Sequence, residues 1–228
     1  MVTESDRLRA SFMDTVYRDA DRDDTNYYVD RAAAADGPVL ELGCGTGRIY
    51  LAMLAAGLDA DGLDLDSASL ELLRERAAEA GLEPSVREAD MTDFETDRAY
   101  ALVTCPFNAV QELTTIEQQQ AVLESAHDAL APGGAFVFDT FVPEFAYIAE
   151  SWGEWQQRTV EFRGASHEFR TRSRLVDAVT QEYVSEKRAV APDGSELFAF
   201  EGRATLLPAR EVELLVRQSP FEDRKSVV

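Results

Sequence analysis

The sequence predicts an α/β protein: an open, mostly parallel sheet with helices on both faces, to which a small antiparallel sheet is added. Between residues 37 and 142, short apolar segments alternate with segments of helical periodicity, a pattern typical of parallel strands joined by helices. After Pro143 a period-two alternation replaces it, which indicates antiparallel strands. At 228 residues, the chain is expected to form one domain with an insertion.

The expected elements follow from local signals. The polar residues 1–36 predict one or two short helices that lead into the core. The strand Val39–Leu42 is expected next, followed by a helix over about 48–56 and the strand Asp59–Asp64. A helix that is capped by Asp66 or Ser67 then stops at Gly81. The strands Ser85–Ala89 and Tyr100–Cys105 follow it. Thr115 and Gln118 fit a capping box before the next helix, and Ala135–Thr140 is the expected fifth strand.

The second half of the chain predicts the antiparallel sheet. A short helix with Phe145 and Ile148 comes first, and a helix over Ala209–Arg217 comes last. Between them, strands are expected over 157–163, 167–174, 179–188 and 197–207, the last two joined by a hairpin turn at 191–195. The chain thus divides into a helical segment (1–36), a core (37–142), an antiparallel insertion (143–208) and a C-terminal segment (209–228).

The charge balance is strongly acidic. Asp and Glu total 43 against 22 Lys and Arg, which gives a net charge of -21, and Lys187 and Lys225 are the only lysines. Such a chain repels nucleic acid and anionic membranes, although molar salt would weaken that argument. The composition resembles that of proteins from salt-accumulating halophiles. No apolar run is long enough for a membrane span and no signal peptide is recognised, so a cytoplasmic location is expected.

The cysteines and histidines do not predict a metal site. Cys44 and Cys105 form no C-x-x-C pair, and His127 and His167 are far apart in the sequence, so a zinc site is excluded. Free thiols are expected in a cytosolic protein. His167, in the insertion, is the one histidine considered as a base, but an exposed strand residue is the favoured interpretation.

One segment, Glu41-Leu42-Gly43-Cys44-Gly45-Thr46-Gly47-Arg48, carries most of the functional information. A buried strand runs into glycines at alternate positions and a helix follows, so free backbone N–H groups should face a small polar ligand. A dinucleotide turn would have its third glycine at the position of Arg48, and no phosphate-binding loop occurs in the chain.

A second candidate is Asp64, which ends the second expected strand, 21 residues after Gly43. Open α/β sheets bind ligands beyond the carboxyl ends of their strands. A carboxylate at that edge can accept hydrogen bonds from both hydroxyls of a ribose. The alternative role, capping of the next helix, is assigned to Asp66.

The glycine-rich segment resembles the first motif of the class I S-adenosylmethionine-dependent methyltransferases, which share a Rossmann-like core. Further segments resemble later motifs of that family in the same order: Gly62–Asp66, Glu88–Phe94 and Cys105–Ala109. The resemblance covers residues 39–140 and implies S-adenosylmethionine as the cofactor. The cofactor-binding residues that it implies are Glu41, Gly43, Cys44, Gly45, Gly47, Arg48, Asp64, Leu65, Asp90, Met91, Phe107 and Asn108.

The resemblance also implies roles for these residues. Asp64 would bind the ribose and Asp90 the adenine amino group, while Met91 would pack on the adenine ring or simply fill the core. Phe107 and Asn108 would lie beside the methionine end of the cofactor. Glu41 would bind the amino-acid end, often through water, because an unpaired carboxylate in an apolar strand is costly to bury. Arg48 would assist Glu41 or form a surface salt bridge.

The implied activity is methyl transfer to a nitrogen or oxygen atom of a small-molecule acceptor by in-line displacement. No catalytic base is assigned, since one is needed only for a protonated acceptor. The loop after the fourth strand reads Cys105-Pro106-Phe107-Asn108, which argues against methylation of nucleobase or glutamine amino groups. The alternatives are a macromolecular (protein or RNA) methyltransferase and a cofactor-binding protein without catalysis.

The insertion resembles lids that cover the acceptor site, or form dimer contacts, in small-molecule methyltransferases. Arg170, Arg172 and Arg174 share one strand face; they could attract an anionic substrate, but cross-strand pairing with Glu182 and Glu186 is the favoured interpretation. The family's fold closes with a β-hairpin. Here Phe221 resembles its start and the given sequence then ends, so an open edge strand would favour a homodimer.

Overall fold

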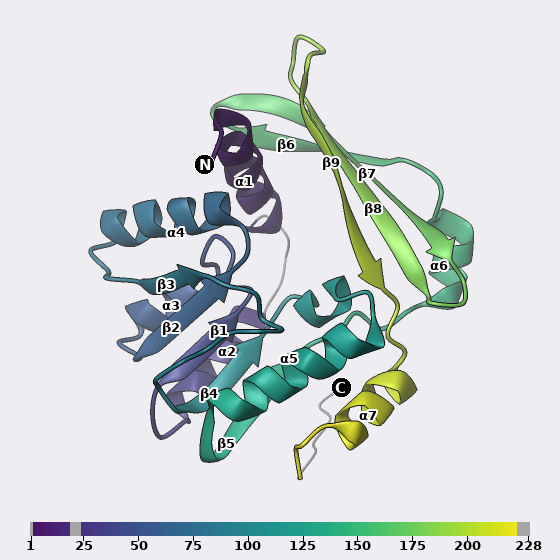
Figure 1. Ribbon diagram of the computed structural model, residues 1–228. Coiled ribbons are helices and arrows are strands. Elements are labelled where there is room, and N and C mark those ends of the chain that lie inside the picture. The colour runs from purple at the N-terminus through teal and green to yellow at the C-terminus, as the bar shows by residue number, and fades with distance from the viewer. Residues whose placement is uncertain (1, 19–23, 223–228) are drawn as a thin grey trace.

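The computed structural model describes residues 2–18 and 24–222, and contains two sheets (Figure 1). The five strands of the first sheet are β1 (Val39–Leu42), β2 (Ala60–Asp64), β3 (Ser85–Glu88), β4 (Tyr100–Cys105) and β5 (Leu130–Phe138). They lie in the order β3-β2-β1-β4-β5, and every pair is parallel. The predicted fold class is confirmed.

Helices cover both faces of this sheet, because alternate strand residues are apolar on both sides. On one face, Leu40 and Leu42 of β1 pack with α5 (Ile116–Ala129) and with Val212 of α7 (Ala209–Gln218). On the other face, Val39 packs with α2 (Asp24–Ala33), α3 (Tyr50–Ala55) and α4 (Ser67–Glu79). Glu41 lies between Leu40 and Leu42 in β1, so its side chain points away from their face of the sheet and toward the face of Val39.

The local capping signals are confirmed. Asp66 is the N-cap of α4 and accepts a hydrogen bond from the Ala68 amide, and Thr115 and Gln118 form both halves of a capping box before α5. Several boundaries differ by a few residues, and the largest difference in the parallel sheet is at β5, which begins at Leu130 instead of Ala135 and ends at Phe138 instead of Thr140. Leu130 pairs with Tyr100, and the register then shifts before Ala135 pairs with Leu102. Gly133, with a φ angle of +83°, lies within this irregular part of the strand.

The second sheet is antiparallel throughout, with four strands in the order β6-β7-β8-β9. The strands are β6 (Gln156–Phe162), β7 (Ala165–Asp177), β8 (Glu182–Val190) and β9 (Glu196–Thr205), preceded by the helix α6 (Phe145–Ser151). The hairpin between β8 and β9 is closed by the Ala191 amide, which donates to the Ser195 carbonyl oxygen at 2.8 Å. The predicted antiparallel insertion is confirmed.

The arginines of β7 pair mainly with glutamates. Arg172 makes a bidentate contact with Glu186 across the strands (2.7 and 2.9 Å), and Arg174 Nε lies 3.3 Å from the same carboxylate. Arg170 pairs with Glu168 on its own strand. The cross-strand interpretation is thus confirmed for Arg172 and Arg174.

The first helix, α1 (Glu4–Arg18), bridges the two sheets (Figure 1). It lies against α4 on one side and against β6 on the other. Its fully buried Phe12 contacts the rings of Phe162, Phe198 and Phe169, with centroids 5.0, 5.3 and 5.8 Å away. One or two N-terminal helices were predicted, and two are present because α2 follows α1; α1, however, packs in the core of the second sheet.

This packing corrects one expectation. His167 is only 8% exposed, and its ring contacts Phe12 and Phe162. Its Nδ1 lies 2.9 Å from the Ala165 carbonyl oxygen. His167 is not an exposed strand residue, because α1 covers the face of β7 on which it lies.

At the other end of the core, β5 is the last strand of the first sheet within residues 2–18 and 24–222. Phe221 stacks on Phe136 of β5 with centroids 6.0 Å apart, and its ring is 5.5 Å from that of His127.

None of the helices in the described part of the chain has both the length and the apolar character that a bilayer crossing requires.

Candidate functional site

The glycine turn after β1 takes a backbone path that suits glycine. Gly43, Gly45 and Gly47 have φ angles of +70°, +52° and +87°, in the left-handed region. A Cβ atom on Gly47 would also lie 2.8 Å from Leu51 Cγ and 2.9 Å from Leu73 Cγ. The amides of Gly43 and Cys44 donate to the Leu63 carbonyl oxygen at 2.8 and 3.0 Å. The turn is therefore tied directly to β2.

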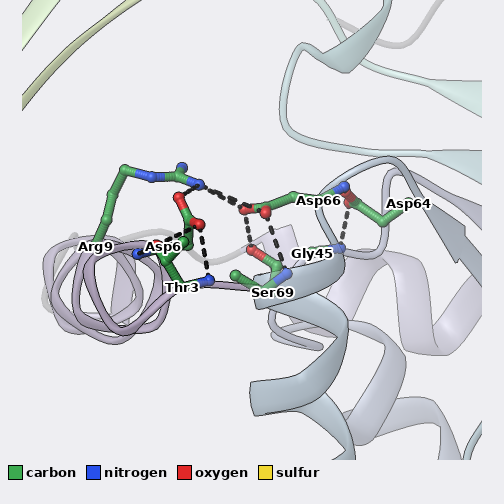
Figure 2. A network of polar contacts seen from close by, with 8 residues as sticks. Thr3, Asp6, Arg9, Gly45, Asp64, Asp66 and Ser69 are labelled. Carbon is green, nitrogen blue, oxygen red and sulfur yellow. Dashed lines mark hydrogen bonds and ion pairs between the residues drawn. The ribbon is translucent and has the colours of Figure 1, made fainter. Parts of the chain in front are cut away.

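Asp64 ends β2 beside this turn. Its Oδ2 accepts a hydrogen bond from the Gly45 amide and its Oδ1 accepts one from the Asp66 amide, each at 2.7 Å (Figure 2). Burial raises the pKa of the Asp64 carboxyl, and these two amides oppose that rise. Each carboxylate oxygen keeps a further acceptor position. The sequence-predicted pair, the glycine turn and Asp64, is thus in direct contact.

Glu41 is the buried group that most needs a partner. It is 2% exposed, and its Oε2 has no hydrogen-bond partner among the described residues. Burial raises the pKa of its carboxyl to about 8, against the attraction of Arg48. A cationic group bound at the glycine turn would supply what this carboxylate lacks. The ammonium of S-adenosylmethionine is such a group, and the Asp64 carboxylate suits its ribose, so these residues fit the cofactor.

Arg48 is held by α2. Its Nη2 donates to Asp24 Oδ2 at 2.9 Å and its Nη1 to Thr25 Oγ1 at 3.1 Å. The guanidinium also lies over the ring of Phe107, 5.4 Å from the centroid. Of the two roles considered for Arg48, this geometry agrees with the salt bridge, although only 19% of the side chain is exposed.

The loop after β4 also follows a left-handed path, with φ of +66° at Phe107 and +60° at Asn108. A residue that sequence analysis missed, Asp139, holds it there. The Asp139 carboxylate accepts hydrogen bonds from the amides of Phe107 (2.7 Å) and Asn108 (2.9 Å) and from the Tyr28 hydroxyl (2.6 Å). The signal available in the sequence was an acidic residue near the carboxyl end of the expected strand Ala135–Thr140.

Replacing Asp139 with asparagine should destabilise the protein by about 1–2 kcal/mol, because an amide nitrogen cannot accept a hydrogen bond from a backbone N–H. S-adenosylmethionine should also bind more weakly, as the loop at Phe107 and Asn108 loses its anchor. Urea unfolding and calorimetry would measure the two effects. Asp128→Asn is the control, since the Asp128 side chain is 85% exposed. Equal stability of the two variants would contradict the anchoring role.

The remaining predicted residues are more dispersed. Asp90 follows β3, and its Oδ1 accepts hydrogen bonds from the amide and hydroxyl of Thr92, both at 2.8 Å. Met91 packs against the core, with its sulfur 3.9 Å from that of Cys105, and Leu65 is 63% exposed. Cys44 and Cys105 are free, and burial raises the pKa of both thiols. The assignment of Asp90, Met91, Leu65 and Cys44 to the cofactor stays a prediction.

Helix α1 contacts each part of this site. Asp14 accepts a hydrogen bond from the Thr46 hydroxyl of the glycine turn at 2.7 Å. Arg9 Nη2 lies 3.4 Å from the Asp66 carboxylate, as Figure 2 shows. Tyr17 packs edge-on against Phe107, with centroids 4.9 Å apart. Sequence analysis assigned no residue of this helix to the site, although Phe12, Met13 and Val16 have the spacing of a buried helix face.

Glu41 predicts a pH dependence of stability. Its pKa lies near 8 in the folded protein against an ordinary 4.5, so the folded state binds more protons between these values. Stability should therefore fall as pH rises from about 4.5 to 8, at up to about 1.4 kcal/mol per pH unit from this group. In Glu41→Gln, this fall in the free energy of unfolding with rising pH should be absent.

Urea unfolding of wild type and Glu41→Gln at several pH values would test this. The variant's advantage should grow toward pH 8, whereas its affinity for S-adenosylmethionine should fall. The exposed Glu117 of α5 provides a control as Glu117→Gln. A stability difference that does not change with pH would contradict the shifted pKa of Glu41.

Comparison with known proteins agrees with this geometry. Residues 39–134 match the family model of a methyltransferase domain. The ubiquinone biosynthesis O-methyltransferase of Bordetella avium is 32% identical over 104 residues, which are 45% of this chain and 42% of that protein. This match spans less than half of the relative's length. The cypemycin N-terminal methyltransferase of a Streptomyces species is 27% identical over 184 residues, 81% of this chain and 72% of the relative.

Solved structures extend the match to most of the chain. The S-adenosylmethionine-bound amino pentose methyltransferase of Micromonospora echinaspora superposes with a TM-score of 0.71 and 27% identity, over 89% of this chain and 85% of that one. Streptomyces venezuelae DesVI superposes with a TM-score of 0.73 over 92% and 88% of the two chains, at 23% identity. Residues 39–134, with the glycine turn joined to Asp64, are thus a methyltransferase domain, and the chain has the fold of the S-adenosylmethionine-dependent methyltransferases.

Proposed function

We propose that this protein transfers the methyl group of S-adenosylmethionine to a nitrogen or oxygen atom of a small molecule. The observation that carries the proposal is the arrangement of two carboxylates about one glycine turn. Oε2 of the buried Glu41 has no hydrogen-bond partner among the described residues, and Asp64 accepts a hydrogen bond from the Gly45 amide. One suits the ammonium of the cofactor and the other its ribose.

The bound cofactor supplies an electrophilic methyl group on a good leaving group. The protein's own task is to hold the acceptor atom in line and to exclude water. The bridge formed by α1 between the parallel sheet and β6–β9 supports a role for the second sheet in covering the acceptor.

A nitrogen acceptor is favoured over oxygen. The two relatives at 27% identity that match most of this chain are named as an amino pentose methyltransferase and as a cypemycin N-terminal methyltransferase. The second of these names also supports the runner-up function, methylation of a peptide or protein amino terminus. Small-molecule transfer remains the main proposal, since the solved neighbours include an amino pentose methyltransferase.

The test is calorimetry with S-adenosylmethionine in high salt, followed by incubation with methyl-labelled cofactor and either a metabolite extract or short peptides. Label in small metabolites supports the main proposal, whereas label in peptides supports the runner-up. Cofactor binding without release of S-adenosylhomocysteine would indicate a binding protein. No binding at millimolar cofactor would exclude the whole proposal.

We also infer the setting in which the protein works. A net charge of -21 with only two lysines supports a salt-rich cytoplasm, and two free buried thiols are consistent with a reducing compartment. The same acidity argues against nucleic acid as the substrate. The position of β5 at the end of the sheet supports a homodimer, which light scattering at high salt would test.

A further inference from the structure

Glu112 occupies a rigid position beside the loop that follows β4. It is the last residue of the short 3-10 helix η1 (Ala109–Glu112). The preceding residue, Gln111, is 1% exposed and fastens η1 on two sides. Its Nε2 donates a hydrogen bond to the Thr205 carbonyl oxygen of β9 at 3.0 Å. Its Oε1 accepts a hydrogen bond from the Phe141 amide at 2.6 Å. The backbone that carries Glu112 is therefore fixed to β9 of the second sheet and to the segment that follows β5 of the first.

The second sheet faces Glu112 with two polar side chains of β8. Ala189 packs in the cluster around α1, and strand alternation places Lys187 and Tyr183 on the same face of the sheet. Lys187 Nζ lies over the ring of Phe200, 5.3 Å from its centroid. Lys187 and Tyr183 both interact electrostatically with Glu112. The carboxylate thus lies where β8 approaches the parallel sheet.

Glu112 is also within electrostatic reach of the cofactor site. The protein around it raises the pKa of the Glu112 carboxyl through desolvation; Lys187 opposes the rise and Asp64 adds to it. Its charge also raises the pKa of Cys105 at the end of β4, where burial is the larger cause. The groups around Glu112 therefore come from the ends of β2 and β4 and from the second sheet.

Despite these neighbours, Glu112 retains its acceptor positions. No hydrogen bond or ion pair joins its carboxylate to residues 2–18 or 24–222, and its side chain is exposed to solvent. Lys187 acts on it from beyond ion-pair contact. Glu112 is therefore a carboxylate on a fixed backbone beside the loop that follows β4, open to water and not used by the fold, so it is available to bind a substrate.

We propose that Glu112 is a catalytic residue that binds an amine acceptor as its ammonium ion and takes up the ammonium proton before methyl transfer. This inference rests on the proposed function and specifies its substrate class. An ammonium nitrogen has no lone pair. Once the proton moves to the Glu112 carboxylate, the neutral amine forms the new N–C bond while the C–S bond breaks and its electrons remain on sulfur. The product is an N-methylammonium ion, and Glu112 returns its proton to water.

The experiment compares wild type with Glu112→Gln and Glu112→Asp, and uses Glu117→Gln on α5 as the matched control. Calorimetry first measures S-adenosylhomocysteine binding. Calorimetry on that complex then measures the affinity for glucosamine, ethanolamine and diglycine, and for glucose and ethylene glycol as hydroxyl counterparts. Finally, the initial rate with S-adenosylmethionine is measured against pH.

Glu112→Gln should bind S-adenosylhomocysteine as wild type does, but bind the amines at least about tenfold more weakly. Its rate should fall about a hundredfold, and its pH profile should move to higher pH, since the amine must then lose its proton to water. Glu112→Asp should recover part of both effects, and Glu117→Gln should behave as wild type.

Three results would overturn the assignment of Glu112 alone: unchanged amine affinity and rate in Glu112→Gln, a preference of wild type for the hydroxyl compounds, or binding of none of the amines to wild type. In each of these cases S-adenosylhomocysteine still binds. Failure of wild type to bind S-adenosylhomocysteine would overturn the proposed function as well, so the two failures are distinguishable.

Discussion

Replacing Asp64 with alanine is expected to weaken S-adenosylmethionine binding by roughly a hundredfold, or about 3 kcal/mol. The substitution removes a charged acceptor from the proposed ribose site, and hydrogen bonds to charged groups contribute about 1.5–3 kcal/mol each. It also removes the acceptor of two backbone hydrogen bonds, which the Gly45 and Asp66 amides donate to the Asp64 carboxylate at 2.7 Å. The glycine turn would therefore lose its link to the end of β2, in addition to the ribose contact.

Calorimetry on Asp64→Ala and Asp64→Asn would separate these two contributions. The asparagine carbonyl oxygen can still accept one backbone amide, so that variant should lose less affinity than alanine. Asp128→Ala is the control, because the Asp128 side chain is 85% exposed. Thermal unfolding of each variant would show that the weaker binding comes from a folded protein. Unchanged affinity in Asp64→Ala would mean that the ribose is bound elsewhere.

The features that the sequence predicted correctly are those that neighbouring residues determine. The Asp66 cap, the Thr115–Gln118 capping box and the β8–β9 hairpin each depend on fewer than about ten consecutive residues. The contact between the glycine turn and Asp64 followed from the rule that the carboxyl ends of parallel strands share one edge. To apply that rule, only the order of the strands in the sheet is needed, and the order of the family-like motifs along the chain implied it.

The features that the sequence did not reveal depend on distant packing. His167 alternates in a polar strand, and only the placement of α1 against β7 buries it. Asp139 reads as an ordinary strand end until its three donors, from α2 and the loop after β4, are brought together. Glu112 carries no motif at all. Its role depends on β8, which follows it by about 70 residues in the chain.

The second large effect is expected at Asp14, which fastens α1 to the core. Asp14 is 3% exposed and pairs with Arg76 of α4, which is 17% exposed, and it accepts the Thr46 hydroxyl. Asp14→Leu would leave Arg76 largely buried without its counter-charge. Breaking a buried pair costs about 3–5 kcal/mol. Because Arg76 keeps some access to water, we expect a loss of about 3 kcal/mol in the free energy of unfolding.

A double-mutant cycle with Arg76→Met distinguishes this cost from a simple loss of packing. If the unpaired guanidinium causes the loss, Arg76→Met in the Asp14→Leu background should recover at least half of it, since apolar residues of similar volume replace buried pairs well. The exposed pair Arg217–Glu213 is the control, with side chains 61% and 58% exposed, and its coupling should stay below about 0.5 kcal/mol. Additive losses at Asp14 and Arg76 would show that packing alone, centred on Phe12, holds α1 over the glycine turn.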